Sequence, residues 1–420
     1  MVLRRWEVLV TMVWLVGLAG PVALPFFAET VRLDENALLP HQSAPTFRTG
    51  GSKLRPGFNL RSVLRDHGLP FSPAAGVDAC DATTTVVKAG SNPQQQSLLW
   101  FVDAALLPLS LDLMLQLGGS KWLARDAIFV HLNASSASCD PSHAAAEWLR
   151  GYHETGDHAD SGAGNVAAAI ILSQGPGPEG GEADLAVRLN GDAGLLPNLD
   201  LVTTLRIVHG NAGGASIALA GMADCERAMC GPPQSPRDLA RSTSCLWRFY
   251  QGHWMGRSDF PGGTFRSLAI DALELAVSPA ASRGGRVTAH TLRSLELLSR
   301  SLNNVEEKLH HSTYAYLLFS LGCGASSPLA WIWFVVATAA PVALLPLLAL
   351  WRESRSKGGS PSTGRVGLAM ASVAVVCLAC LYLFRDPLRA YTLCALAYPT
   401  AMLYHRIVVS AAGGPKARQD

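Results

Sequence analysis

Charged residues are scarce in this sequence. Only 16% of the 420 residues are Asp, Glu, Lys or Arg, whereas a typical soluble domain contains about 25%. Apolar residues make up 49% of the chain, and the formal net charge is only +2. A balance so close to zero gives no sign of a nucleic-acid-binding surface. The shortage of charge indicates instead that part of the chain lies in a membrane.

The motifs of common hydrolases are also missing. The sequence has no His-Glu-x-x-His and no Gly-x-Ser-x-Gly. One stretch, "GYHETGDHAD" at 151–160, concentrates side chains that suit a divalent cation, but glycines flank and interrupt it, so its backbone is not held in one geometry. These side chains belong to His153, Glu154, Asp157, His158 and Asp160. We interpret the stretch as a solvated polar loop rather than a metal site.

A long apolar segment lies close to the N-terminus. Val8–Ala28 contains 21 residues without a charge and follows Arg4 and Arg5. It is long enough to span a bilayer. A cleaved signal peptide is the alternative, but the apolar core of such a peptide is usually about 7–15 residues long. We therefore expect an uncleaved signal anchor with a cytoplasmic N-terminus.

Three further apolar segments, at 329–350, 366–384 and 391–412, are each long enough to span a membrane. The basic connection between the first two is expected to be cytoplasmic. The prediction is therefore a cytoplasmic N-terminus and signal anchor at 1–28, a luminal domain at 29–328, three transmembrane helices at 329–412 and a cytoplasmic tail at 413–420. Both termini are expected in the cytoplasm.

The luminal region contains several cysteines and one glycosylation sequon. An oxidising lumen permits disulfides among Cys80, Cys139, Cys225, Cys230 and Cys245. Cys225 and Cys230 are close enough to suggest a small loop closed by one bond, although spacing leaves the connectivity open. The sequon Asn133-Ala-Ser135 predicts glycosylation at Asn133.

Short apolar runs alternate with helical patterns in this region, which is typical of an α/β domain. Strands are expected at 83–88, 127–132, 166–172, 183–189, 215–221 and 268–277, and helices at 96–117, 142–153, 198–208, 236–252 and 288–321. The apolar run at 97–117 contains Asp103 and Asp112, so we interpret it as a buried helix rather than a membrane span. Asp200 follows Pro197 and Asn198 and is expected to cap or start a helix.

Four phrases carry a resemblance to a known family. "ENALLP" at 35–40, "AEWLRGYHE" at 146–154, "RLNGDAGLLPNLDL" at 188–201 and "VEEKLHHSTYAYLL" at 305–318 resemble, in order and spacing, the GPI-anchor attachment subunit of the GPI transamidase. The resemblance covers roughly residues 1–330. The matching motif positions are Glu35, Asn36, Leu39, Pro40, Asn190, Gly191, Leu196, Pro197, Asn198, Leu199 and Asp200.

This resemblance implies a fold, a location and partners. It implies a luminal domain folded like an M28 zinc aminopeptidase, with a mixed sheet flanked by helices, between the signal anchor and the three transmembrane helices. It also implies an endoplasmic-reticulum membrane complex that contains a caspase-like cysteine subunit. That subunit cuts the precursor protein. The chain has fewer transmembrane segments than members of this family usually carry.

An M28 zinc site needs anionic ligands at the ends of strands. The residues after the expected strands at 83–88, 127–132 and 166–172 are Ala89–Asn92, Asn133–Ser136 and Ser173–Gln174, which include no carboxylate or histidine. We therefore expect no catalytic, cofactor-binding or metal-binding residues. The predicted function is a non-catalytic subunit that binds and presents the GPI lipid or the precursor protein. A membrane-tethered M28-type metalloenzyme, cutting or forming an amide bond, is the alternative.

Overall fold

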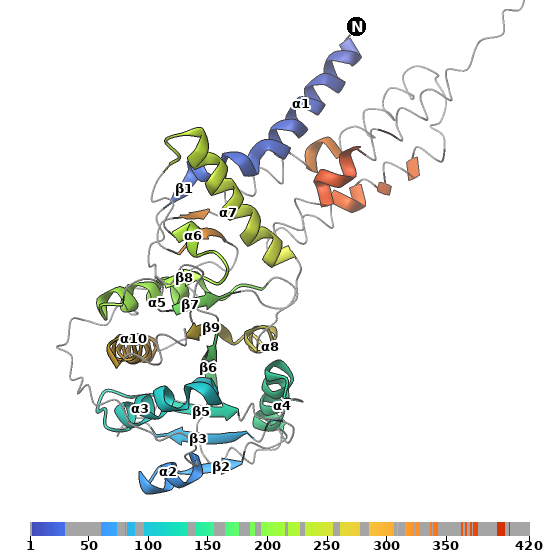
Figure 1. Cartoon of the computed structure of the whole chain (residues 1–420). Helices are drawn as coiled ribbons and strands as arrows, with labels where there is room; N and C mark the ends of the chain where they lie inside the picture. Colours follow the sequence, from blue (N-terminus) through green and yellow to red (C-terminus); the bar gives the residue numbers. More distant parts are fainter. Residues whose placement is uncertain are drawn as a thin grey trace, which may run out of the picture. The chain divides into compact units, whose positions relative to one another are not determined.

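Figure 1 shows the computed structural model of the chain. It describes residues 2–29, 60–73, 80, 82–88, 96–132, 139–154, 164–175, 185–189, 195–214, 217–226, 232–254, 261–277, 285–305, 309, 316–321 and 324–326, and, nearer the C-terminus, 337, 339–342, 363, 366–367, 370–371, 373–376, 393–399 and 403. The chain divides into two compact units. One contains residues 1–29, 231–244 and 326–420, and the other contains 30–230 and 245–325.

The larger sheet belongs to the second unit and has eight strands. Their order is β2-β3-β5-β4-β6-β9-β7-β8. The central strands β5, β4, β6 and β9 run parallel, β3 is antiparallel to β5, and β7 is antiparallel to β9. The bounds are β2 Phe71–Pro73, β3 Thr83–Val87, β4 Gln96–Asp103, β5 Asp126–Leu132, β6 Asn165–Gln174, β7 Leu185–Arg188, β8 Ile217–Leu219 and β9 Asp271–Val277.

Helices cover both faces of this sheet, as Figure 1 shows, with α4 and α8 on one side and α3, α5 and α10 on the other. Between residues 60 and 303, the described helices are α2 Leu60–Asp66, α3 Leu107–Gly118, α4 Pro141–Glu154, α5 Leu199–Asn211, α6 Ala223–Glu226, α7 Pro236–Trp254, α8 Gly262–Ser267 and α10 Gly285–Asn303, with a 3-10 turn, η4, at Ala104–Leu106. This arrangement confirms the α/β class expected from the sequence.

The core between the sheet and α4 is built from alternate residues of the central strands. Phe101 of β4 and Ile171 of β6 pack in one buried cluster with Trp148 of α4 and Phe265 of α8. The Phe101 and Phe265 rings meet edge to face, with their centroids 5.8 Å apart. The indole N–H of Trp148 donates to Thr84 Oγ1 at 3.2 Å, so its one polar atom is satisfied inside the core.

Most elements expected from the sequence are present. The six expected strands correspond to β3, β5, β6, β7, β8 and β9, and the expected helices at 142–153, 198–208 and 236–252 correspond to α4, α5 and α7. The short elements α2, β2 and α6 had no expected counterpart. Each has seven residues or fewer, which is too short to display a clear periodicity.

The expected helix at 96–117 is wrong over its first half. Gln96–Asp103 is the central strand β4, which pairs with both β5 and β6. Because β4 is buried on both faces, its inner residues Leu98–Val102 are all apolar, and periodicity alone cannot distinguish such a run from a buried helix. The helix begins only at Leu107, and Pro108 lies in its first turn.

The expected helix at 288–321 is too long. Helix α10 ends at Asn303, and Leu317–Ser320 forms strand β10, which neighbours β11 (Gly324–Ser326) in a separate small sheet. The Asn303 side chain accepts the N–H groups of Ala124 and Arg125 at 2.8 and 2.9 Å and donates to the Trp122 carbonyl at 2.9 Å. The side chain of the last residue of α10 therefore binds the loop before β5, so the helix ends where it meets that loop. His310 and His311 lie outside the described residues.

The first unit contains helix α1 (Val2–Ala23), the 3-10 turn η1 (Leu24–Phe27) and the two-residue strand β1 (Ala28–Glu29). Trp14 of α1 stacks on Tyr398 with ring centroids 4.7 Å apart, and the hydroxyls of Thr11 and Tyr398 are 2.9 Å apart. Val10 packs in the same cluster with Val342. The N-terminal helix is thus joined to segments near the C-terminus by apolar, aromatic and hydroxyl contacts.

The described residues contain no helix with both the length and the apolar character needed to cross a membrane. Helix α1 ends at Ala23, five residues before the end of the expected span at 8–28. The expected spans at 329–350, 366–384 and 391–412 lie largely outside the described residues. Several apolar side chains of α1, among them Val8, Met12 and Val16, are more than half exposed.

Two disulfides join elements of the second unit. Cys80 pairs with Cys139 across 59 residues, which ties the entry to β3 to the start of α4. Cys225 of α6 pairs with Cys245 of α7. The suggested bond between Cys225 and Cys230 is therefore wrong, because the folding of α6 against α7 places Cys245 beside Cys225. Cys230 itself lies outside the described residues.

We predict that non-reducing peptide mapping will find Cys225 linked to Cys245. Cys245→Ser should lower the free energy of unfolding by about 3 kcal/mol, the value expected when a bond that closes a loop of about this length is lost. The matched control is Cys230→Ser, which should leave both the map and the stability unchanged. A peptide that links Cys225 to Cys230 would contradict the assigned pairing.

Candidate functional site

The carboxyl ends of the parallel strands meet at one edge of the larger sheet, where open α/β sheets bind their ligands. Near this edge lies a row of polar side chains: Asp103 at the end of β4, Ser173 near the end of β6, Glu274 three residues before the end of β9, and Arg188 opposite Glu274 on the antiparallel strand β7. We call these four residues the strand-end row. The row crosses four neighbouring strands in the order of the sheet.

The strand registers place the row on a single face of the sheet. Val102 is paired with Leu172, so the next residues along, Asp103 and Ser173, are neighbours, and Glu274 lies directly opposite Arg188. Because side chains alternate along a strand, Asp103 lies on the same face as Phe101, two residues before it. That face is the one covered by α4 and α8.

Hydrogen bonds converge on one carboxylate oxygen of Glu274. Arg188 Nη1 donates to Glu274 Oε1 at 2.6 Å, and the Ser173 hydroxyl donates to the same oxygen. The Glu274 side chain is only 1% exposed, whereas that of Arg188 is 36% exposed. The second oxygen, Oε2, is buried and has no hydrogen-bond partner. The buried carboxylate is therefore compensated on one side by a guanidinium that still reaches water.

Burial raises the pKa of Glu274, and the nearby charge of Asp103 raises it further. The Ser173 hydroxyl and the Arg188 guanidinium act in the opposite direction, because both stabilise the ionised form. Burial has the largest effect. The ion pair with Arg188 thus reduces the free-energy cost of ionising the buried Glu274 carboxylate.

The strand-end row offers little to a metal ion. The positive charge beside Glu274 is supplied by Arg188, and a guanidinium would repel a divalent cation placed there. Within the part of the chain that the structure describes, no group of three His, Cys, Asp or Glu side chains is arranged to hold a metal ion. The row can instead present the partly exposed ion pair of Arg188 and Glu274 to another molecule.

We predict that removing Arg188 destabilises the domain more at high pH than at low pH. Arg188→Met should cost about 2–3 kcal/mol, less than a fully buried pair would, because the arginine is partly solvated. The pKa of Glu274 is already raised in the folded state and rises further without Arg188. A carboxyl group whose pKa is raised by folding does not destabilise the folded state at low pH, and it does so as pH rises through the folded pKa. The denaturant midpoint of Arg188→Met should therefore fall further below that of the wild type at about pH 8 than at about pH 5.

The double variant Arg188→Met, Glu274→Leu provides the control. Replacing both partners leaves no buried unpaired charge, so its loss of stability should be smaller than the sum of the two single losses and should not depend on pH. Additive losses, or an Arg188→Met loss that is the same at both pH values, would show that the pair is not coupled.

The phrase "LLPNLDL" forms a buried junction rather than an open site. Asn198 caps α5, with its Oδ1 accepting the Asp200 N–H at 2.8 Å, and its own N–H donates to Asp271 Oδ1 at 3.1 Å. The Tyr316 hydroxyl donates to the Pro197 carbonyl at 3.0 Å. The expected helix start is thus confirmed, with Asn198 as the cap and Asp200 in the first turn.

This junction adjoins the strand-end row through α8. Arg266 of α8 is buried and donates to the carbonyl of Leu189, the residue after Arg188. Burial raises the pKa of Tyr316, and the charge of Arg266 opposes that change. Of the family motif positions named above, Leu196 to Asp200 therefore have a structural role in this junction. Glu35, Asn36, Leu39, Pro40, Asn190 and Gly191 lie outside the described residues.

The polar cluster at 151–160 is described only in its first four residues. Residues 151–154 complete helix α4, where His153 is exposed and the Tyr152 hydroxyl donates to the Gly164 carbonyl. Asp157, His158 and Asp160 lie outside the described residues, as does Asn133, the residue after β5. The loop interpretation is therefore wrong for residues 151–154, which continue the helix, and it stays a prediction for 155–160, as does glycosylation at Asn133.

A buried histidine and serine lie on the other face of the sheet. His131 Nε2 is 2.9 Å from the hydroxyl oxygen of Ser110, and both residues are at most 3% exposed. Burial lowers the pKa of His131 to about 4, so the imidazole is neutral near pH 7. The pair resembles part of a hydrolase triad, but with both side chains enclosed in the core we assign it a packing role.

Sequence reasoning did not single out Glu274 or Arg188. Both lie within expected strands, at 268–277 and 183–189. The available signal was a charged residue in a strand whose neighbours are almost all apolar, because such a residue needs a partner when the strand is buried. Which residue is the partner depends on the strand register, which the sequence does not reveal.

Comparisons with known proteins give one family and a distant structure. A family model described as Gaa1-like, GPI transamidase component, matches residues 103–322. Among solved structures, six chains match. One is a metallo-carboxypeptidase from Pseudomonas aeruginosa in complex with (2-guanidinoethylmercapto)succinic acid, with 11% identity over 58% of this chain and 68% of that chain and a TM-score of 0.32, a similarity too low to support any argument. No curated protein sequence matches the chain. Because the family match spans more than half of the residues, the chain belongs to the Gaa1-like family of GPI transamidase components.

Proposed function

We propose that this component is a non-catalytic subunit that binds and presents the GPI lipid or the precursor protein to a catalytic partner in the same complex. The observation that carries the proposal is the strand-end row. There, the carboxylate of Glu274 is bonded to Arg188 and Ser173, close to the edge where a hydrolytic enzyme of this architecture would need open anionic ligands.

The chemistry of the row supports binding rather than hydrolysis. A zinc hydrolase needs several ligands with free lone pairs and one open coordination position. Glu274 Oε1 is occupied by two donors, and the neighbouring guanidinium adds a positive charge. Arg188, which is 36% exposed, is the member of the pair that faces water and is available to a partner or substrate.

The remaining parts of the proposal follow from the sequence. The catalytic partner is a caspase-like cysteine subunit, and the substrates are the GPI glycolipid and precursor proteins. The complex lies in the endoplasmic-reticulum membrane. The chain has a signal anchor at 1–28, a luminal M28-like domain at 29–328, three transmembrane helices at 329–412 and cytoplasmic termini. The exposed apolar side chains of α1 support membrane anchoring.

The alternative, an M28-type metalloenzyme, makes a different prediction about metal content. His153 and His158 are the histidines of the polar cluster at 151–160. Stoichiometric zinc in the purified full-length chain, lost on substitution of both histidines, would contradict the non-catalytic proposal.

The proposed topology predicts that Asn133 is glycosylated. Endoglycosidase treatment should increase the electrophoretic mobility of the wild type but not of Asn133→Gln. A tag inserted at residue 358, in the expected cytoplasmic connection, should be digested when protease is added to intact microsomes. Protection of that tag would contradict the topology, whatever the state of Asn133.

A second prediction separates anchoring from function. A chain that ends near Ser327 keeps α1 and the luminal domain but lacks the three expected transmembrane segments. It should still enter the lumen, because α1 provides the anchor, and it should fail to restore GPI attachment in cells that lack the full-length chain. Surface display of a GPI-anchored reporter, measured by flow cytometry, is the readout. Full rescue would show that the three segments serve only as anchors.

A further inference from the structure

Helix α7 has two faces of different character. Its buried face carries Ser242, Cys245, Leu246 and Phe249, each at most 6% exposed. On the opposite side, Arg237, Ala240, Arg241, Ser244 and Trp247 are exposed. This pattern follows the period of an α-helix, with one side packed and the other facing solvent. The exposed side is the part of α7 that is available to another molecule.

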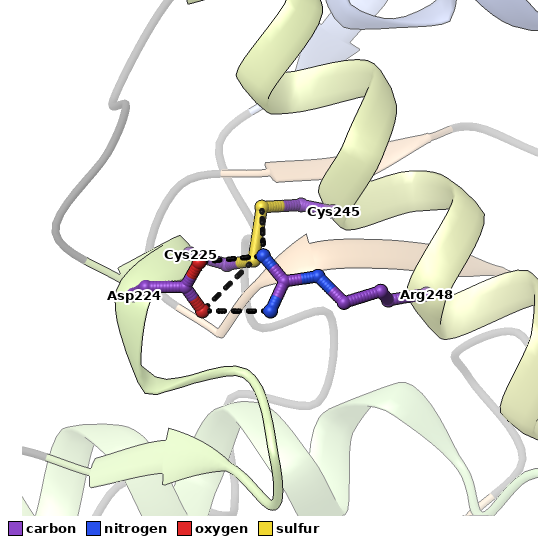
Figure 2. A network of polar contacts seen from close by, with 4 residues as sticks. All are labelled: Asp224, Cys225, Cys245 and Arg248. Atoms are coloured by element: carbon purple, nitrogen blue, oxygen red, sulfur yellow. Dashed lines mark hydrogen bonds and ion pairs between the residues drawn. A yellow bond between two sulfur atoms is a disulfide. The ribbon is translucent and has the colours of Figure 1, made fainter. Parts of the chain in front are cut away.

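Two contacts join α7 to α6 (Figure 2). Cys245 is joined to Cys225 by a disulfide. Three residues further along α7, Arg248 donates to both carboxylate oxygens of Asp224, at 2.9 and 2.5 Å. A covalent bond and a two-point ion pair on neighbouring turns hold the helix against rotation about its axis.

Three arginines of α7 lie along one narrow stripe. Arg237, Arg241, Ser244 and Arg248 are separated by four, three and four residues, which places them on the same side of the helix. Arg248 is neutralised by Asp224. Among the described residues, neither Arg237 nor Arg241 forms an ion pair with an acidic side chain, so this end of the stripe carries two positive charges toward solvent.

We infer that Arg237 and Arg241 dock α7 on the phosphate groups of an anionic lipid surface. Two observations favour a lipid surface over other anionic partners. Residues 236–244 belong to the same compact unit as α1, the helix with the exposed apolar side chains. Trp247, on the exposed side of α7, is 56% exposed, and tryptophan is the residue most typical of the membrane–water interface. Arginine binds phosphate with two parallel hydrogen bonds.

The inference rests on the proposed membrane attachment of the chain, and it adds a second contact with the bilayer. Attachment alone would come from α1 and the apolar C-terminal segments. The added contact would hold α7 along the headgroups of the leaflet and is electrostatic. It should therefore weaken with salt, whereas apolar insertion should not.

Photocrosslinking tests the inference directly. The full-length chain is placed in nanodiscs of phosphatidylcholine, with or without phosphatidylserine, with p-benzoylphenylalanine at the position of Ser244. We expect a lipid adduct, detected by mass spectrometry, with a higher yield when phosphatidylserine is present. One basic residue near an anionic surface is worth about a fivefold change in binding, so Arg237→Gln with Arg241→Gln should lower this added yield several-fold. High salt should have the same effect.

A matched control uses the same photoreactive group at Leu268, which is 54% exposed between α8 and β9 and should give no lipid adduct. Equal adducts at both positions, or a yield at Ser244 that is insensitive to the two arginines, would overturn the inference. So would crosslinking of Ser244 to a protein instead of a lipid in native membranes. Failure of the chain to enter nanodiscs would instead contradict the proposed membrane attachment. The Gln variants must keep the wild-type circular dichroism melting curve, and Arg237→Lys with Arg241→Lys should retain the lipid adduct.

Discussion

The burial of β4 and β6 on both faces is the constraint on which the second unit of this chain depends. Strands Gln96–Asp103 and Asn165–Gln174 lie side by side in the middle of the eight-stranded sheet, and their inner residues, 98–102 and 166–172, are all apolar. Two buried faces require helices on both sides, which α4 and α8 provide on one face and α3, α5 and α10 on the other. The backbone of parallel strands also brings their carboxyl ends to one edge, where the burial ends and polar residues appear.

Close to that edge, neighbouring side chains offset the cost of burying a charged carboxylate. A carboxylate at position 274 lies where burial opposes its ionisation, and Arg188 and Ser173 offset part of that cost. The Glu274 carboxylate thus lies near the edge where α/β sheets usually bind ligands, but one of its oxygens is already bonded and is not open to a metal ion. This arrangement is the basis of the proposal that this GPI transamidase component positions a substrate or another subunit.

The small helix α6 connects several parts of the second unit. Its residues Asp224 and Cys225 hold α7 through an ion pair and a disulfide, and the carboxylate of Glu226 accepts hydrogen bonds from the Ser320 hydroxyl and the Leu321 N–H at the end of β10. Three consecutive side chains thus bind two elements that are distant in sequence. The part of α7 that begins at Cys245 is thus joined to α6 by a disulfide and an ion pair.

The sequence by itself determined the α/β class, six of the strands, the helices α4, α5 and α7, and the place where α5 starts. It did so because alternation, helical periodicity and cap chemistry are local properties. The family phrases were equally readable, since they are contiguous. Tertiary structure decided that Gln96–Asp103 is a strand, because burial on both faces removes the alternation that would reveal it. It also decided that Cys225 pairs with Cys245 and that Arg188 faces Glu274, because both contacts depend on how separated segments pack and register, which no local pattern encodes.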